Sequence, residues 1–492
     1  MSVQTSVLPT PTPAAAPALH RPAAPYHLHT RAGTTLTAAE PGAPPAVVVS
    51  TRAGTYRLPV AESAVAELVV SLGATPRPTA ELVAELTARP GTALPAVLGL
   101  QLALTRLQAT GALDSVVLAG AHEVARLTGE GVLPVPPLRR RTPAPGVLSR
   151  FTVVTVDGDR LVLQSGLSHL LVRLDPALLP AVVSGALAQS EDWPERGAAD
   201  LLACAGLLVE PGSEDTREAR QWSACDLWFH RRTAESRSVD RYGGTYPLDD
   251  VAPLPYGGTD LAVLATVPLP VTDVEHLRRT DPPLAEVMES RRSCRRFDPE
   301  RPLTLEALAE LLSRSCRARR VTVADRGLEV ADRPFPSGGS IHELETYLAV
   351  TSGQGLAPGL WRYRPDLHAL DLVAEPGPAV SRIVTDARST AQLDADPPVV
   401  LLVTARFGRL MWKYETMAYA LLLKHTGVLM QTVYLNATAM GLGTCALGGT
   451  STEFFARATG SAPLAEGAVG MMVLGVPAEL TAAEADGLWG SR

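Results

Sequence analysis

The sequence contains almost no lysine. Of its 44 Lys and Arg residues, only Lys413 and Lys424 are lysine. An arginine guanidinium stays protonated in proteins, whereas a lysine ammonium can lose its proton. Either lysine therefore marks a position where a proton-transferring amine is needed, unless it has persisted by chance.

Cysteine is also scarce, and its arrangement excludes two kinds of site. The five cysteines are odd in number and form no C-x-x-C pair. Neither a disulfide framework nor a zinc or other metal site is indicated, and we expect a reducing, cytoplasmic location. The residues are Cys204, Cys225, Cys294, Cys316 and Cys445.

The chain lacks a positive charge excess and long apolar runs. Its net charge of −7 argues against a nucleic-acid partner. No apolar run approaches the roughly 20 residues of a membrane span, and no secretory signal begins the chain. With 46% hydrophobic and 19% charged residues, the composition is that of a globular protein. At 492 residues, the chain should form about three domains.

The N-terminal half predicts a tail and two small modules. Residues 1–45 are rich in Pro, Ala and Thr without periodicity, which predicts disorder. Residues 46–129 combine short strands with three helical patterns, and residues 148–215 repeat this after a hairpin turn at Asp157-Gly158. We interpret both as winged-helix-like modules. Since a recognition helix rich in Lys and Arg is missing, we expect peptide-binding or structural roles rather than DNA binding.

The C-terminal half predicts an α+β domain. Residues 216–260 form an aromatic-rich linker segment, and residues 261–492 alternate strand-like and helical runs. The longest predicted helix covers 415–440, with Gly441 at its C′ position. Residues 441–446 match a dinucleotide G-x-G-x-x-A pattern, but they follow a helix rather than a strand, and we reject the match.

Two short motifs indicate a flat, phosphorylated ligand. Arg291, Ser293 and Arg295 offer guanidinium groups and a hydroxyl, which suit a phosphate monoester. A solvated helix end is the equally weighted alternative for this motif. In Ser337-Gly338-Gly339, glycines without side chains would let a flat ligand approach the backbone. Taken alone, that motif is more typical of an ordinary turn.

Five segments, taken in their order along the chain, resemble the SagB-type dehydrogenases. These are FMN-dependent enzymes of the nitroreductase fold that aromatise thiazolines and oxazolines in ribosomally made peptides. The resemblance covers residues 216–492 well and the N-terminal modules loosely. The segments are SRRSCRRF, PSGGSIHELETYL, GLWRY, the run from WKYETMAYA to GTCALGG, and W-x3-D-x3-H at Trp222, Asp226 and His230.

The resemblance implies a fold, a cofactor and partners. The fold would be a mixed sheet wrapped by helices in an intertwined homodimer, with FMN at the subunit interface. The phosphate motif would hold the FMN phosphate, Ser337, Gly338 and Gly339 would border the isoalloxazine ring, and Gly448-Gly449 would face its N5 edge. The substrate would be a modified precursor peptide, with a cyclodehydratase as a possible partner.

Lys413-Tyr414 matches the Lys-Tyr pair that this family uses for catalysis. Azole formation removes a hydride and a proton; the flavin takes the hydride, and the protein must supply a base. Free Tyr and Lys titrate near pH 10, so one must be tuned or act through the other. We hypothesise that Lys413 assists Tyr414 in taking the ring proton; the alternative is a surface cation beside a packing residue.

Two other functions stay open from the sequence. A nitro- or quinone-reducing flavoenzyme that uses NAD(P)H would share the fold, but the Lys413-Tyr414 pair and the long N-terminal extension count against it. A peptide-binding scaffold without cofactor is the second alternative, and the intact phosphate and glycine motifs count against that.

Overall fold

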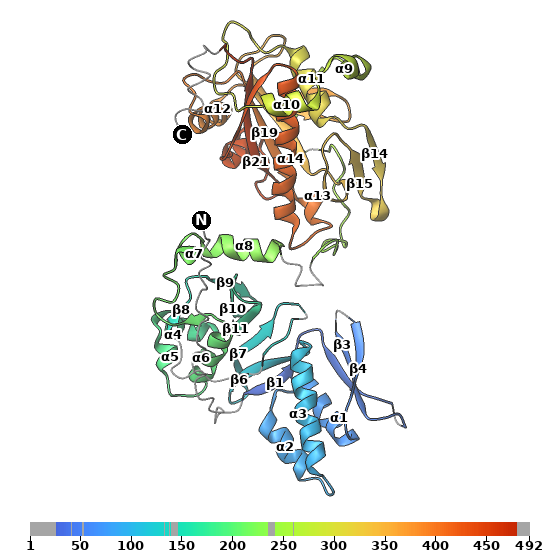
Figure 1. The fold of residues 1–492 in the computed structure, drawn as a ribbon, viewed down its shortest axis with the longest axis vertical. Coiled ribbons are helices and arrows are strands. Elements are labelled where there is room, and N and C mark those ends of the chain that lie inside the picture. The colour runs from blue at the N-terminus through green and yellow to red at the C-terminus, as the bar shows by residue number, and fades with distance from the viewer. Residues whose placement is uncertain are drawn as a thin grey trace, which may run out of the picture. The chain divides into compact units, whose positions relative to one another are not determined.

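The computed structural model divides into two compact units, an N-terminal unit (residues 1–242) and a C-terminal unit (residues 243–492). It describes residues 26–40, 42–51, 54–131, 133–136, 138, 146–234, 242–258 and 260–479. Figure 1 shows the elements of each unit. Among helices of these residues, none combines the length and apolar content that a bilayer crossing requires.

One seven-stranded sheet joins the two predicted N-terminal modules. Its order is β5-β1-β6-β7-β11-β10-β9, and β7 pairs directly with β11. The strands are β1 (His27–Thr30), β5 (Arg77–Pro78), β6 (Leu113–Ala119), β7 (His122–Gly129), β9 (Thr152–Asp157), β10 (Arg160–Ser165) and β11 (Leu170–Leu174). The modules have separate apolar cores but a common sheet. A boundary between two sequence repeats therefore does not separate two sheets here.

The first half of this unit begins earlier than predicted. Strand β1 and strand β2 (Thr35–Ala38) lie inside the segment expected to be disordered, so that boundary at residue 45 is too late. Both strands have few apolar side chains, but their pairing with later strands orders them. Residues 1–25 lie outside the described part. The other elements are β3 (Ala46–Thr51), β4 (Gly54–Pro59), α1 (Ser63–Val70), η1 (Ser71–Gly73), α2 (Thr79–Thr87) and α3 (Leu94–Ala109).

The second half contains the expected hairpin and helices. Gly158 has φ +61° in the turn between β9 and β10, as the Asp157-Gly158 pair predicts. The remaining elements are β8 (Val147–Leu148), η2 (Pro176–Leu178), α4 (Leu179–Ser184), α5 (Ala186–Gln189), α6 (Glu195–Cys204), β12 (Leu208–Val209), α7 (Arg217–Arg220) and α8 (Ala224–Ala234). The last two show that part of the predicted linker is helical. The winged-helix assignment stays a prediction.

The C-terminal unit is built on an antiparallel seven-stranded sheet. Its order is β13-β18-β17-β16-β19-β21-β20. The strands are β13 (Ala265–Pro268), β16 (Leu344–Val350), β17 (Gly359–Arg364), β18 (Ala369–Ala374), β19 (Val399–Arg406), β20 (Gly443–Leu447) and β21 (Glu466–Gly475). Residues 344–350 and 399–406 are buried throughout, because helices cover both faces of the sheet.

Successive side chains of β19 show the two layers of helices. Leu401 belongs to the core with α11 (Leu305–Cys316) and α14 (Ala418–Ala439). Its neighbour Leu402 belongs to the core with α12 (Pro378–Ala391) and α15 (Thr452–Thr459) on the opposite face. This arrangement confirms the α+β fold expected for the C-terminal domain.

Shorter elements surround this sheet, and α14 runs along it (Figure 1). The predicted helix over 415–440 is confirmed as α14, and Gly441 follows it with φ +69°. A hairpin of β14 (Arg320–Val323) and β15 (Glu329–Asp332) packs near the loop that precedes β16. The others are α9 (Val274–Thr280), α10 (Leu284–Ser290), η3 (Asp325–Gly327), η4 (Gly338–Ser340) and α13 (Phe407–Met411).

Candidate active site

The Ser337-Gly338-Gly339 motif forms a strained loop before β16. Gly339, Ser340 and His342 have φ of +62°, +56° and +50°, a left-handed conformation that non-glycine residues rarely adopt. Such conformations persist only where neighbouring contacts enforce them, and they cluster at functional sites. Contacts with neighbouring residues therefore hold the loop in a conformation that its local sequence alone would not maintain.

Lys413 and Tyr414 lie against this loop. A Cβ atom placed on Gly339 would lie 2.9 Å from Lys413 Nζ and 3.1 Å from Tyr414 Oη. Both side chains are half-buried, and Lys413 Nζ is 5.5 Å from the centroid of the Tyr414 ring. Any larger side chain at this position would have to displace the amine or the phenol. The structure thus brings together two motifs that lie more than 70 residues apart in the sequence.

Gly244 and Tyr246, near the start of the C-terminal unit, also contact the segment around Lys413. Gly244 forms a β-bridge with Tyr414, and the Tyr246 amide donates to the Lys413 carbonyl at 3.0 Å. The Tyr246 ring packs edge-on against Trp412 and lies 5.9 Å from Lys413 Nζ. Because these contacts hold the backbone on both sides of Lys413, its side chain starts from a fixed point.

A buried His-Glu pair holds the glycine loop to α14. The Gly338 amide donates to His425 Nε2 at 2.8 Å, and His425 Nδ1 lies 2.7 Å from Glu343 Oε1. Since Nε2 accepts a hydrogen bond, the proton of a neutral imidazole sits on Nδ1 and is donated to Glu343. Ser337 Oγ donates to Glu343 Oε2 at 3.2 Å and accepts from the His342 amide.

Arg409 connects the loop to the helix before Lys413. Its side chain is almost fully buried and donates to the carbonyls of Leu254, Glu329 and Ile341. Burial lowers the pKa of Arg409 to about 10, with Arg406 as a second, smaller cause. Arg409 stays protonated at neutral pH and fixes three backbone segments around the loop.

His342 is buried next to this arrangement. Burial, and secondarily the charge of Arg333, lowers the pKa of His342 to about 3. Its ring packs edge-on against Phe335. His342 is therefore a neutral packing residue at neutral pH, in keeping with its apolar contact.

The phosphate motif lies beside a later turn of α14. Ser293 Oγ is 3.0 Å from Tyr434 Oη, which accepts from the Ala446 amide at 2.7 Å. The Arg291 guanidinium stacks 5.2 Å from the centroid of the Tyr434 ring. Arg295 and Ser293 are exposed. Two arginines and an exposed hydroxyl form a donor set suited to a phosphate monoester.

The second glycine pair follows β20. A Cβ on Gly448 would meet no heavy atom of the described residues within 4 Å, and one on Gly449 would lie 3.7 Å from Thr390 Oγ1. The backbone there is open to a ligand. Nine residues separate His425 from Tyr434 along α14, a rise of about 13 Å. The loop and the phosphate motif thus lie along one helix without direct contact between them.

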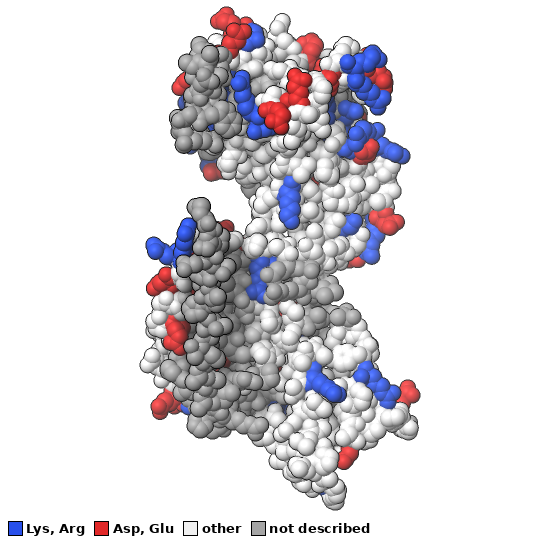
Figure 2. Space-filling view, viewed as in Figure 1, with Lys and Arg blue, Asp and Glu red and all other residues white. Residues whose placement is uncertain are grey.

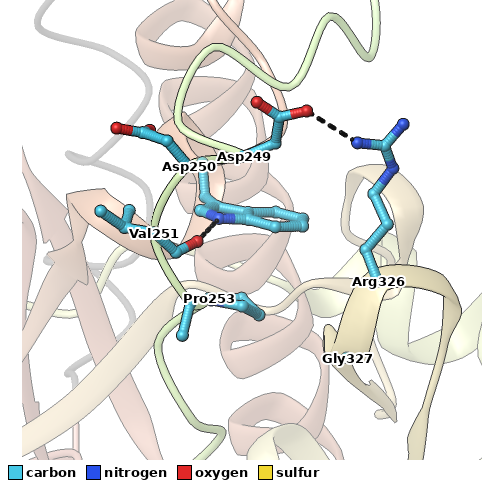
Figure 3. Close-up of a pocket in the computed structure, with 8 residues that line it drawn as sticks. Asp249, Asp250, Val251, Pro253, Arg326 and Gly327 are labelled. Atoms are coloured by element: carbon cyan, nitrogen blue, oxygen red, sulfur yellow. Dashed lines mark hydrogen bonds and ion pairs between the residues drawn. The ribbon is translucent and has the colours of Figure 1, made fainter.

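A pocket of about 490 Å³ adjoins Trp412. Figure 3 shows Asp249, Asp250, Val251 and Pro253 lining it together with Arg326, and Trp412 is also part of its lining. Trp412 Nε1 donates to the Val251 carbonyl, and Arg326 pairs with Asp249 at 2.9 Å. Since Asp249 and Asp250 line it, the pocket suits an anionic phosphate less well than the arginine motif does.

Sequence reasoning missed the residues that organise the site. His425, Arg409 and Tyr434 contact the predicted motifs across more than ten residues of chain. Glu343 contacts Ser337 six residues away, but its pairing with His425 spans 82 residues. Nothing in their spacing marks these pairings. His425 had one signal, its position beside Lys424 in an apolar helix.

Comparison with known proteins points to the C-terminal unit. Residues 288–476 match the model of the nitroreductase family. A Methanocaldococcus jannaschii protein named as a nitroreductase is 28% identical over 183 residues, which are 37% of this chain and 84% of that protein.

Two solved structures are similar to part of this chain. The E. coli microcin synthetase McbBCD complex with truncated pro-MccB17 bound has 18% identity over 43% of this chain and 84% of that chain, with a TM-score of 0.33. A nitroreductase from Desulfovibrio desulfuricans in complex with FMN has 17% identity over 42% of this chain and 96% of that chain, with a TM-score of 0.27. The C-terminal part of this chain carries a nitroreductase-family domain.

Proposed function

We propose that this protein is an FMN-dependent dehydrogenase that oxidises thiazolines or oxazolines of a modified peptide to thiazoles or oxazoles. The observation that carries the proposal is the placement of Lys413 Nζ and Tyr414 Oη beside Gly339. A ring oxidation of this kind needs a proton acceptor next to a flat cofactor. The family match supports a flavoprotein oxidoreductase, and the Lys-Tyr pair supports the azoline substrate.

The residues present suit FMN. Arg291, Ser293 and Arg295 would hold its phosphate, while Ser337, Gly338 and Gly339 would border its ring. Gly448 and Gly449 would leave space at the N5 edge. When bound, FMN supplies the acceptor for the two electrons removed from the azoline as hydride.

Tyr414, assisted by Lys413, would accept the proton that the azoline ring loses. Tyr414 would receive the ring proton at Oη, and Lys413 would lower the cost of the phenolate by lying close to it. Loop 337–342 keeps both groups at one place, and half-burial limits competition from water. The ring thereby loses one hydride and one proton, a mass change of about 2 Da.

Homodimer formation is part of the proposal. Helix α14 is rich in apolar residues, and Tyr419, Leu423 and Val428 remain exposed on it beside Lys424 and Gln431. A second copy covering this face would complete the helix, and sedimentation velocity would show a species of twice the 51.9 kDa chain mass.

The N-terminal unit would engage the precursor peptide or a cyclodehydratase. Helix α3 exposes Leu94, Leu98 and Leu102, which are 71%, 56% and 51% accessible and lie at i, i+4 and i+8. On the face shown in Figure 2, blue and red atoms of the described residues are interspersed. An apolar stripe on a helix suits a protein or peptide partner better than a phosphate backbone.

The visible spectrum of the purified protein tests the cofactor assignment. We expect flavin absorbance, with FMN released at about one per chain. Addition of NADH should leave the flavin largely oxidised, whereas steady reduction would favour a nitro- or quinone-reducing enzyme. A colourless protein that takes up no FMN would contradict the proposal and favour a peptide-binding scaffold.

A further inference from the structure

We infer that His425 is a positioning residue for the reaction, because it holds the Gly338 amide and thereby keeps Gly339 against Lys413 and Tyr414. The inference rests on the proposed function for its consequence in turnover. Its structural part concerns only residues of this chain.

The hydrogen bonds around His425 determine which nitrogen of its imidazole carries the proton. Gly338 N–H points at Nε2 from 2.8 Å, so Nε2 must carry a lone pair. Glu343 is fully buried and accepts from Nδ1. A carboxylate in this position fixes both the tautomer and the orientation of an imidazole, as it does where a histidine must present one nitrogen to a partner.

The loop depends on this contact more than an ordinary turn would. Gly339, Ser340 and His342 have left-handed backbone angles. The intrinsic backbone preferences of Ser and His therefore do not maintain the conformation of the loop. A Cβ on Gly338 would approach Leu421 Cδ2 to 2.6 Å, which shows how closely the loop packs on α14. With His425 as the anchor, the loop cannot move away from the helix that follows Lys413 and Tyr414.

A shift of the loop would affect turnover rather than ligand binding. Gly339 is the backbone point against which the amine and the phenol are placed. A misplacement of about 1 Å at reacting groups can cost on the order of 10²-fold in rate. The phosphate motif lies about 13 Å further along α14, so FMN should stay bound through its phosphate even though the loop borders its ring.

The variants His425→Gln and His425→Asn form a matched pair that differs by one methylene. Gln can place its amide oxygen near the position of Nε2 and accept from Gly338, whereas Asn reaches only the position of Nδ1. Hydrogen exchange of the peptide covering residues 336–342 reports the loop directly, and steady-state kinetics on an azoline peptide reports kcat and KM.

We expect His425→Asn to speed exchange in the loop and lower kcat about 10–100-fold, with KM and bound FMN nearly unchanged. His425→Gln should keep the protection and most of kcat. Equal protection and kcat in His425→Asn and the wild type would overturn the inference, as would loss of both in a folded His425→Gln. If the wild type oxidises no azoline, the proposed function fails, and the exchange data still decide whether His425 holds the loop.

Discussion

At the scale of single residues, the proposed chemistry depends on the amine of Lys413. Its position beside Gly339 and Tyr414 gives a physical reason for a lysine in a chain that otherwise uses arginine. The second lysine, Lys424, is exposed on α14. The rarity of lysine thus pointed to one residue of the proposed site and one surface residue.

Two substitutions of Lys413 distinguish a role of its positive charge from a role of its amine in proton transfer. We expect Lys413→Ala to keep FMN and to lose azole formation by about 10²-fold or more, since general acid–base groups contribute 10²–10⁴. Lys413→Arg keeps the charge but cannot release the proton. An inactive Lys413→Arg would indicate proton transfer by the amine, and an active one would indicate that charge alone assists Tyr414. Full turnover by Lys413→Ala would contradict both roles.

Acid should destabilise the C-terminal unit through His342. Its pKa lies at about 3 in the folded protein and near 6.5 in the unfolded chain. The unfolded state therefore binds the extra proton first, and the free energy of unfolding falls as pH drops from about 6.5 towards 3. This residue contributes a slope of up to about 1.4 kcal/mol per pH unit.

The variant His342→Asn tests that slope. Asn tolerates the left-handed backbone at φ +50° but does not titrate. Denaturant unfolding at several pH values should show a shallower decline for the variant than for the wild type. Parallel curves would exclude His342 as the titrating group.

At the scale of elements, the loop before β16 determines where the motifs meet. Residues 337–342 connect the buried strand to α14 and α13 through His425 and Arg409. The sequence predicted β16, α14 and the hairpin at Gly158, because local periodicity and turn residues determine them. It could not predict that His425 anchors the loop, because that contact joins residues 87 positions apart.

Alanine variants of two glycines with similar backbone angles distinguish the effect of backbone strain from the effect of a new side-chain contact. Gly339→Ala and Gly441→Ala both force an alanine into φ of +62° and +69°, at a cost of about 1–2 kcal/mol each. Only the Cβ at Gly339 would approach Lys413 and Tyr414; at Gly441 it meets no described atom within 4 Å. Thermal unfolding should show similar losses of stability, while azoline turnover should fall in Gly339→Ala alone. Equal turnover in the two variants would contradict the proposed site.

At the scale of the whole molecule, the chain consists of two compact units. The C-terminal unit holds all ten predicted site residues, and the N-terminal unit contributes an extensive sheet and an apolar helix face. Composition predicted the order of these parts but not the common N-terminal sheet. Pairing of β7 with β11 joins strands about 40 residues apart, which no local pattern reveals.

The exposed leucines of α3 give a test of the N-terminal unit. Leu98→Gln should raise KM for a full-length precursor about 10- to 100-fold, since burying a leucine contributes about 1.5–3 kcal/mol, and should leave kcat unchanged. A short azoline peptide without the leader should show no change. Leu167→Gln, at a position 58% exposed elsewhere in the unit, serves as the matched control. Unchanged KM in Leu98→Gln would exclude this face as the docking surface.

The mass of a thiazoline-containing peptide after incubation with the FMN-loaded protein in air tests the central claim most directly. The placement of Lys413 and Tyr414 beside Gly339 predicts a loss of about 2 Da per ring, and the same peptide with Lys413→Ala should keep its mass. An unchanged peptide in the presence of fully FMN-loaded wild-type protein would contradict azoline oxidation.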